Sequence, residues 1–148
     1  MKAMRHAILM ILADSGFWIA LGNRRDRHHF AARAAAERWS DEGFMSTWPV
    51  LTEVTHLLTA RIGIRQALDF MDAIAQGACE VPTLPENALA HAAALMRQYR
   101  DLPMDLADAS LVILAEQFNE GRILSTDLRD FSGYRWKNTR PFTNLLLP

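Results

Sequence analysis

Short apolar runs alternate along the chain with longer segments in which apolar residues recur at helical spacing. The first run covers residues 7–13 and stops at Asp14 and Ser15. A continuous apolar run that ends at a turn is typical of a strand buried on both faces, and such strands favour a parallel sheet. Further strand patterns, the first of them ended by Pro49, occur at 44–49, 78–84 and 122–127.

Helical periodicity fills the intervals between these runs. Glycine ends two of the helices, at Gly43 and Gly77, and Pro85 opens another at a position that needs no amide donor. The expected helices are one that starts at residue 17 and those at 28–43, 50–61, 65–77, 85–100 and 105–121. This alternation predicts a three-layer α/β/α fold with a central, mostly parallel sheet. We expect a single domain over residues 1–148, because the chain has no internal repeat or linker.

Composition narrows the possible classes of protein. Half of the 148 residues are hydrophobic, enough for one well-buried core. The charged fraction of 22% and the formal net charge of -1 exclude a disordered acidic tail and a surface that is basic all over. A nucleic-acid partner would therefore meet a local basic patch. The single cysteine, Cys79, excludes an internal disulfide and a thiolate metal cluster, and indicates a reducing, cytoplasmic setting.

The N-terminal segment has the charge order of a secretion leader, with Lys2, Arg5 and His6 ahead of the apolar run at 7–13. That run is short, and Asp14 follows it without the small-residue pattern of a cleavage site. We therefore expect no secretion signal. We also expect no membrane anchor, because no segment approaches the roughly 18 apolar residues that a spanning helix needs.

Five carboxylates are placed to meet at one edge of the predicted sheet. Asp14 and Asp127 directly follow strand patterns, and ligands of open parallel sheets bind beyond the carboxyl ends of the strands. Glu53 falls in the first turns of a helix that follows a strand. Asp105 and Asp108 are one helical turn apart and share a face of the helix that leads into the Asp127 strand.

Carboxylates gathered in this way repel one another and raise one another's pKa values, so the cluster needs a cation. Several hard oxygen ligands favour Mg2+ or Mn2+, which keep water molecules for the substrate and the nucleophile. The chemistry that this predicts is metal-assisted hydrolysis of a phosphodiester, in which the metal polarises a phosphoryl oxygen and lowers the pKa of the attacking water.

Each acid also has a purely structural interpretation. Asp14 and Asp105 are suitable helix N-caps, and Asp127 is a common turn residue. Glu53 taken alone resembles a solvated helix residue. Asp108 lies deeper in an apolar helix, where we expect capping to explain little, so we favour it over Asp105 as a direct metal ligand. The convergence of the whole set is what favours a functional site.

Four segments in this order resemble the PIN domain, and within it the toxin ribonucleases of bacterial VapBC-type toxin–antitoxin pairs. They are "LADSGFWIAL", "STWPVLTEVTHLL", "LPMDLADASLVILAE" and "ILSTDLRDF". The resemblance implies a metal-dependent endoribonuclease that acts on single-stranded RNA and is paired with an antitoxin protein. It also implies a homodimer.

By position, the resemblance makes catalytic acids of Asp14, Glu53, Asp108 and Asp127, with Asp14, Asp108 and Asp127 as the metal ligands. We add Asp105 to the catalytic set. Ser15 and Thr126 match hydroxyl positions that help to hold the site. The chain departs from the family at Gly16, where serine or asparagine is more common, and this puts in doubt a side-chain hydrogen bond beside the first ligand.

The basic cluster "NRRDRHH" at 23–29 lies near the predicted rim. Arg24, Arg25 and Arg27 are suited to grip RNA phosphates, although a solvated helix start explains them equally well. His28 and His29 have no ligand spacing with another histidine or with Cys79, so we expect no zinc site. Phe17, Trp18 and Trp48 are expected to pack, although an exposed aromatic side chain could instead stack on an unpaired base. Trp136 and Phe142, in the loose tail at 134–148, are expected to cover a sheet edge or a partner surface.

Two other classes of protein compete with the ribonuclease. The first is a non-cleaving PIN-fold module that binds RNA or protein, which would have no need of the complete acid set. The second is a phosphoacceptor receiver domain, which needs paired acids after its first strand, where "LADSGF" offers one. The helices at 50–61 and 65–77 carry more apolar surface than one side of a small sheet covers, and this favours a homodimer through Leu57, Leu58, Ile62, Ile64, Phe70, Met71 and Ile74.

Overall fold

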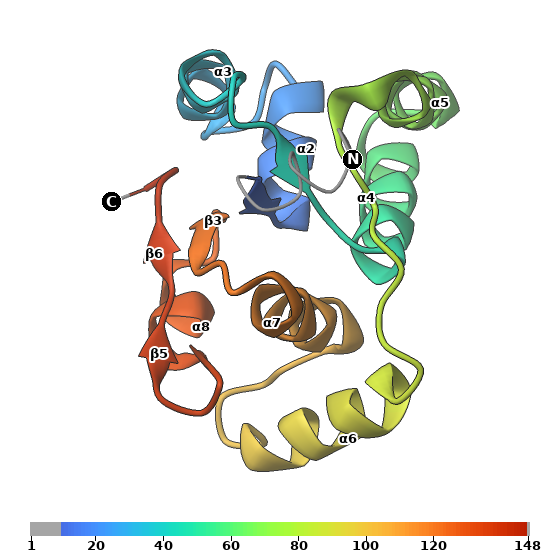
Figure 1. Cartoon of the computed structure of the whole chain (residues 1–148). Coiled ribbons are helices and arrows are strands. Elements are labelled where there is room, and N and C mark those ends of the chain that lie inside the picture. The colour runs from blue at the N-terminus through green and yellow to red at the C-terminus, as the bar shows by residue number, and fades with distance from the viewer. Residues whose placement is uncertain (1–9, 148) are drawn as a thin grey trace.

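The computed structural model of the chain describes residues 10–147 and is built around a parallel sheet (Figure 1). Its strands are β1 (Ile11–Ala13), β2 (Phe44–Met45), β3 (Arg122–Leu124) and β6 (Thr143–Asn144). They lie in the order β2-β1-β3-β6, and each neighbouring pair is parallel. The register pairs Leu12 of β1 with Met45 on one side and Ile123 on the other. The first expected strand is therefore the central one, as its apolar composition predicts.

Helices flank this sheet, and all but the last of them overlap a segment that the sequence pattern predicts to be helical. The helix at 128–133 was not expected, and the helices expected at 28–43 and 85–100 cover only 29–38 and 88–98, so that Gly43 and Pro85 lie outside them. They are α2 (Ser15–Gly22), α3 (His29–Arg38), α4 (Trp48–Arg61), α5 (Ile64–Ala73), α6 (Ala88–Gln98), α7 (Leu106–Phe118) and α8 (Leu128–Gly133). In Figure 1, α3 and α5 lie at the top of the molecule and α6 at the bottom, with β3 and α7 between them and β5 and β6 along the left side. The three-layer α/β/α fold class is confirmed.

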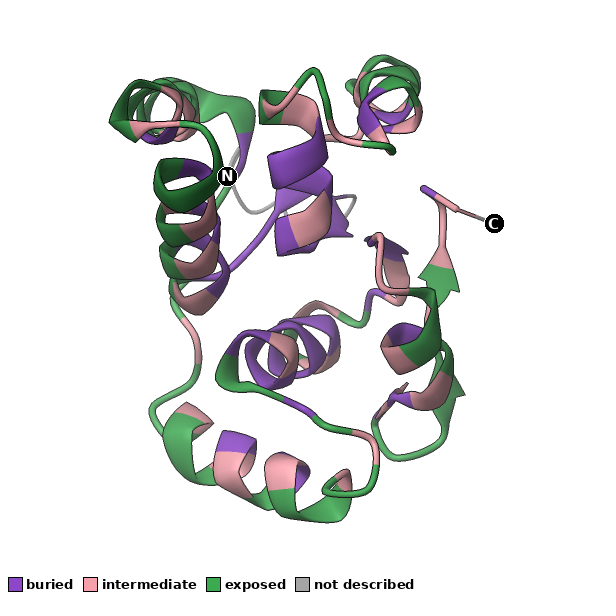
Figure 2. Cartoon of the chain, turned by 180° about the vertical axis from the view of Figure 1, so that it is seen from behind, coloured by how far each residue is buried: buried purple, intermediate pink, exposed green. Residues whose placement is uncertain are grey.

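Helix α7 forms much of the core. It packs on β1, α4 and α6, and every residue from Ala109 to Ala115 is buried. Figure 2 shows the same concentration of buried positions in β1, α2 and α7. Such a helix, apolar on all sides, is stable only inside a protein. Truncating a fully buried leucine such as Leu111 would cost about 2–5 kcal/mol. Asp105 and Asp108, at the start of α7, are therefore attached to a rigid helix.

The strand expected at 44–49 is only two residues long, because a helix begins inside the segment. Thr47 is the N-cap of α4, and its Oγ1 accepts a hydrogen bond from the amide of Val50 at 3.4 Å. Pro49 lies in the first turn, where the missing amide donor costs nothing. Pro49 therefore opens the helix instead of ending the strand.

The prediction of a strand at 78–84 is wrong. The helix before it starts at Ile64 and continues through α5 into a π-helical turn, η1 (Ile74–Ala78), in which Gly77 has a left-handed φ of 100°. After this turn the chain makes a single parallel bridge to β2, between Met45 and Glu80. Pro82 has no amide hydrogen to continue a ladder of hydrogen bonds, so the pairing ends.

The tail at 134–148 is ordered structure where it is described, which corrects the expectation of a loose segment. Strands β4 (Arg135–Trp136) and β5 (Arg140–Pro141) form an antiparallel hairpin, and β6 then extends the main sheet beside β3. Trp136 is buried, and Phe142 contacts Phe131 with ring centroids 5.3 Å apart. The tail therefore covers a sheet edge, one of the two roles expected of it.

Burial decides the expectations about three aromatic residues. Phe17 and Trp18 pack in the core as expected, and Cys79 is a buried free thiol, although it lies outside any strand. Trp48 is 72% exposed, so the expectation that it packs is wrong. Its place at the start of α4 turns the indole outward.

The basic residues of the leader-like N-terminus and the first part of the run at 7–13 lie outside the described residues. Among residues 10–147, no helix combines the length and the apolar character that crossing a membrane requires.

Candidate active site

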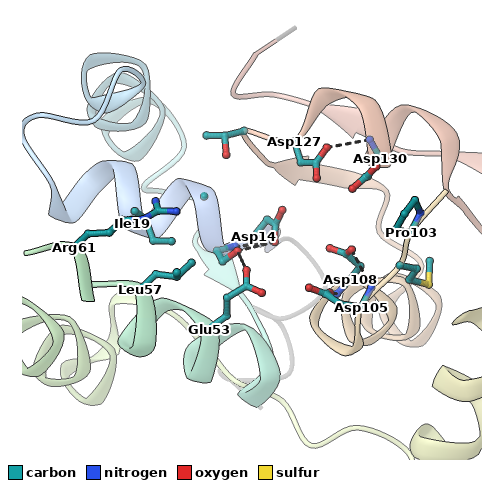
Figure 3. Close-up of a pocket in the computed structure, with 14 residues that line it drawn as sticks. Asp14, Ile19, Glu53, Leu57, Arg61, Pro103, Asp105, Asp108, Asp127 and Asp130 are labelled. Atoms are coloured by element: carbon teal, nitrogen blue, oxygen red, sulfur yellow. Dashed lines mark hydrogen bonds between the residues drawn. The ribbon is translucent and has the colours of Figure 1, made fainter. Parts of the chain in front are cut away.

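One polar cavity of about 440 Å³ collects all five acids that the sequence analysis selected, together with a sixth, Asp130 (Figure 3). They come from the end of β1, from α4, from the start of α7 and from the start of α8, at the carboxyl edge of the sheet. The other named residues that line the cavity include Ser15, Gly16, Arg61 and Thr126. The convergence predicted from the sequence is therefore present.

Asp14 is the most buried of these acids, with 5% of its surface exposed. It follows β1 and is the N-cap of α2, where its Oδ1 accepts a hydrogen bond from the amide of Ser15 at 2.7 Å. Its Oδ2 accepts a second hydrogen bond from the Ser125 hydroxyl at 2.8 Å. Capping therefore explains one carboxylate oxygen, and the other is held by a residue from a neighbouring strand.

Glu53 lies on the face of α4 that borders the cavity. Its Oε1 accepts a hydrogen bond from the Ser15 hydroxyl, which joins α4 to the first turn of α2. The interpretation of Glu53 as a freely solvated helix residue is therefore wrong. Ser15 links two acids, because its amide is bound to Asp14 and its hydroxyl to Glu53.

Asp105 and Asp108 form a reciprocal capping box at the start of α7. Asp105 Oδ1 accepts from the amide of Asp108 at 2.8 Å, and Asp108 Oδ2 accepts from the amide of Asp105 at 3.3 Å. Capping thus involves Asp108 as well as Asp105, which corrects the expectation that it does not. Asp105 is exposed and Asp108 half-buried. Only Asp108 also lies beside the Tyr134 hydroxyl, 3.3 Å from its Oδ2.

Asp127 opens α8 in the same manner. Its Oδ1 accepts from the amide of Asp130 at 3.0 Å, and its own amide donates to the Ser125 hydroxyl at 2.9 Å. Asp130 was not expected in the site. The sequence signal that points to it is the spacing of three residues in "DLRD", which brings both side chains to one side of a helix.

The hydroxyl that holds the first acid belongs to Ser125 and not to Thr126. Ser125 is fully buried and bridges Asp14 and Asp127, whereas Thr126 lines the cavity wall. Thr126 instead accounts for Gly16. A Cβ at residue 16 would lie 1.9 Å from Thr126 Oγ1, so no larger side chain fits there unless Thr126 moves. Glycine at this position therefore leaves room for the Thr126 side chain.

The cavity is strongly acidic, and burial shifts the pKa values of its carboxyl groups upward. Burial raises the pKa of Asp14 to about 6, with smaller contributions from the charges of Glu53 and Asp127. Burial also raises the pKa of Asp108 to about 8, assisted by Asp105 and Asp14, and raises the pKa of Asp130 to about 6, assisted by Asp127. The pKa of Glu53 is raised by burial and by Asp105.

These raised pKa values result from burial and from repulsion between the acids, and only at Asp130 does a nearby cation, Arg129, oppose the shift among the acids whose pKa is raised. Among residues 10–147, no three Asp, Glu, His or Cys side chains are arranged as the ready-made ligands of one cation. The carboxylates are turned instead toward backbone amides, as the caps at Asp14, Asp105 and Asp127 show. The donor chemistry nevertheless fits Mg2+ or Mn2+, because the six acids of the cavity offer hard oxygen donors.

The predicted arginines divide into two groups. Arg24 and Arg25 line a second groove of about 700 Å³ together with Arg61 and Arg65. Arg27 is exposed and borders neither hollow. His29 Nδ1 lies 2.7 Å from the carbonyl of Ala20, which is a structural contact. Arg61, at the end of α4, was not selected from the sequence, although it lies eight residues after Glu53, a little more than two turns along the same helix.

An acidic cavity at the carboxyl edge of a short parallel sheet, framed by α2, α4 and α7, agrees with the family to which residues 11–137 match. The chain belongs to the PIN domain family. The resemblance drawn from the sequence is therefore confirmed.

Two individual relatives refine this placement. The chain is 26% identical over 125 residues to Ribonuclease VapC26 of Mycobacterium tuberculosis, a match that covers 84% of this chain and 92% of that protein. Its fold is also similar to the crystal structure of VapC20 of Mycobacterium tuberculosis, described as a sarcin-ricin loop cleaving toxin. That likeness has a TM-score of 0.71 and 22% identity, and it covers 79% of this chain and 89% of the other.

Proposed function

We propose that this protein is a metal-dependent endoribonuclease that hydrolyses phosphodiester bonds of single-stranded RNA, and that it is the toxin of a toxin–antitoxin pair. The observation that carries the proposal is the meeting of six carboxylates from four parts of the chain in one cavity of a PIN domain. The names of the two relatives, a ribonuclease and an RNA-cleaving toxin, support RNA as the substrate.

Asp14, Asp108 and Asp127 are the proposed ligands of Mg2+ or Mn2+. The bound cation would polarise the phosphoryl oxygen and lower the pKa of the attacking water. Glu53 lies beside Asp14 through Ser15 and is placed to orient that water or to accept its proton. Asp105 acts on the outer side of Asp108 through the capping box. Ser125 holds Asp14 and the Asp127 backbone in place.

The test is cleavage of a labelled single-stranded RNA by the purified protein. We expect cleavage in Mg2+ or Mn2+, no cleavage in EDTA, and recovery when the metal is restored. The Asp14→Asn protein serves as the control for contaminating nuclease, because it should stay folded and inactive. Cleavage that persists unchanged in EDTA would end the metal proposal. RNA binding without cleavage in either metal would favour the non-cleaving module instead.

The phosphoacceptor alternative has no support, because the chain is a PIN domain. We further propose a cytoplasmic location, in keeping with the single buried free thiol of Cys79. A cognate antitoxin remains the proposed protein partner.

We also propose a homodimer through the outer face of α4 and α5. Of the residues selected from the sequence, Leu58 is buried in the core and is removed from that surface. Met71 is 51% exposed and borders an apolar groove with Trp48, Phe70 and Ile74. This groove is the apolar surface most suited to a second copy, because its lining is almost wholly nonpolar.

A further inference from the structure

A basic groove adjoins the acidic cavity and shares one residue with it. Its charged lining consists of Arg24, Arg25, Arg61 and Arg65, with Asp69 as the single acid. Asp69 lies 3.9 Å from Arg65, with both side chains largely exposed. Arg24, Arg25 and Arg61 form no ion pair with any residue between 10 and 147. The groove therefore has an excess of positive charge that the folded chain itself does not neutralise.

The two helices beside Glu53 and Asp14 connect the cavity to this groove. Helix α2 begins at Asp14 and ends next to Asn23, whose side chain accepts a hydrogen bond from the amide of Arg25 at 3.0 Å and so holds the basic turn. Helix α4 carries Glu53 in the cavity and Arg61 at its last residue. The two helices pack against each other. The acidic and basic surfaces are thus held in a fixed relation by the core.

Arg61 lines both hollows, at the junction between them. In Figure 3 it lies at one end of the cavity, past Ile19 and Leu57, while Asp105, Asp108 and Asp130 lie at the other. The opposite rim is negative, and its nearby cation, Arg129, is 3.8 Å from Asp130. Of the cavity-lining residues within 10–147, Arg61 is the one cation, so a polyanion seated in the cavity meets positive charge in the direction of Arg61.

We propose that this groove binds the backbone phosphates of the single-stranded RNA as the strand leaves the cavity past Arg61. The proposal rests on the proposed ribonuclease function and extends it. Arginine suits this task, because its planar guanidinium donates two parallel hydrogen bonds to a phosphate and keeps its charge. Arg61 contacts the phosphate nearest the reacting one, and Arg24 and Arg25 contact phosphates further along the strand.

The first test measures binding, so that it does not depend on cleavage. A labelled single-stranded RNA of about 12 nucleotides, a length within the usual range of single-strand sites, is titrated in Mg2+ with protein carrying Asp108→Asn. Arg24→Gln/Arg25→Gln should weaken RNA binding roughly tenfold. It should also lower the slope of log Kd against log salt concentration by about 1.4, because each lost phosphate contact lowers that slope by about 0.7. Arg61→Gln should lower the slope by about 0.7.

The matched control is Arg97→Gln/Arg100→Gln, which removes the same charge from exposed positions at the end of α6 that border neither hollow. It should leave affinity and slope close to those of the parent. Melting curves of all variants establish that they are folded. In the protein with Asp108 intact, Arg24→Gln/Arg25→Gln should raise KM more than it lowers kcat, because these two arginines line the groove and not the acidic cavity.

The outcomes separate this inference from the proposed function. Parent-like affinity and slope in the groove variants, or an equal loss in the control, would overturn the groove even if RNA is cleaved. If the groove variants lost binding to a protein partner and kept their RNA binding, the RNA-binding role of the groove would also be overturned. The groove would then be a binding surface for that protein. RNA binding that depends on the groove, without cleavage by the parent, would support the groove and overturn the nuclease. Absence of RNA binding would overturn both.

Discussion

The hydroxyl of Ser125 donates a hydrogen bond to Oδ2 of Asp14 at 2.8 Å, across the junction between β3 and β1. The two residues are 111 positions apart in the chain. The same hydroxyl oxygen accepts a hydrogen bond from the amide of Asp127 at 2.9 Å. Ser125 therefore sets the separation of two proposed metal ligands from two neighbouring strands.

Replacing Ser125 with alanine should weaken both catalysis and stability. Asp14 Oδ2 and the Asp127 amide would each lose a partner, and the carboxylates would be free to move apart. We expect cleavage to fall by roughly 10- to 100-fold, as for other outer-shell partners of metal ligands. We expect a loss of about 1–3 kcal/mol in the free energy of unfolding, because buried polar groups lose their hydrogen bonds. Single-turnover cleavage and denaturant unfolding measure the two effects.

Ser46→Ala is the matched control for this change. Ser46 is also fully buried beside β1, and its hydroxyl donates to the carbonyl of Ala13 at 2.8 Å without touching a carboxylate. It should cost a similar amount of stability and leave cleavage by the folded protein near the parent rate. An equal loss of cleavage in both variants would mean that Ser125 acts only through stability.

The two acids of α7 should differ in their effect on activity. Asp108→Asn keeps an oxygen that can accept from the Asp105 amide, so the capping box and the fold should survive. Cleavage should fall by more than about 100-fold, because the charge of a direct metal ligand is removed. Loss of a residue that only supports a ligand costs at most about 100-fold. Asp105→Asn should change stability little, since asparagine caps helices as well as aspartate does, and should lose a smaller share of activity. Cleavage rates in saturating Mg2+ decide between them. An inactive Asp105→Asn beside an active Asp108→Asn would place the ligand one helical turn earlier.

The raised pKa of Asp14 predicts how the stability of the metal-free protein changes with pH. Its folded-state pKa of about 6 is above the ordinary value of 3.8, so the folded protein binds this proton more tightly than the unfolded chain does. The stabilisation is complete below about pH 4 and is lost as the pH rises through about 6. Burial of Asp108 extends the same trend toward pH 8.

Melting temperatures in EDTA provide the measurement. The difference between Asp14→Asn and the parent should grow in favour of the variant as the pH is raised from about 4 to about 8, because the variant carries no charge to bury. Mg2+ should raise the melting temperature of the parent most at the upper end of this range, by binding the ionised folded state. The difference between variant and parent staying constant across the range would contradict the predicted titration.

The proposed homodimer predicts that the mass in solution depends on protein concentration. A single charge introduced in the apolar groove should abolish the dimer. Met71→Lys places a charge in the apolar groove beside Trp48 and should convert a dimer into a monomer in light scattering at micromolar concentration. Leu89→Lys is the control, because Leu89 is 74% exposed on α6 and lies outside that groove. A monomeric parent would refute the dimer, and a dimer that survives Met71→Lys would place the interface elsewhere.

The sequence by itself determined the alternation of strands and helices from β1 to β3, apart from the strand expected at 78–84, and the position of most of the acids. An apolar run that ends in Asp14 can form a buried strand only if the aspartate lies past its end, and the same holds for Asp127 after β3. The spacing of Asp105 and Asp108 places them on one helical turn before any tertiary contact exists. These features follow from the regular geometry of strands and helices, which is set by residues close together in the sequence. They can therefore be derived from the local sequence pattern.

Only the tertiary structure decided which distant side chains meet. Nothing local pairs Ser125 with Asp14, brings Arg61 beside Arg24, turns Trp48 outward or adds β6 to the sheet edge after the tail hairpin. These contacts depend on where the chain returns to the sheet after intervening segments of different length. The entropy of closing such loops changes only slowly with their length, so loop length alone does not select which residues meet. Packing around β1 and α7 therefore selects the partners, and the same packing joins the acidic cavity to the arginines at its end.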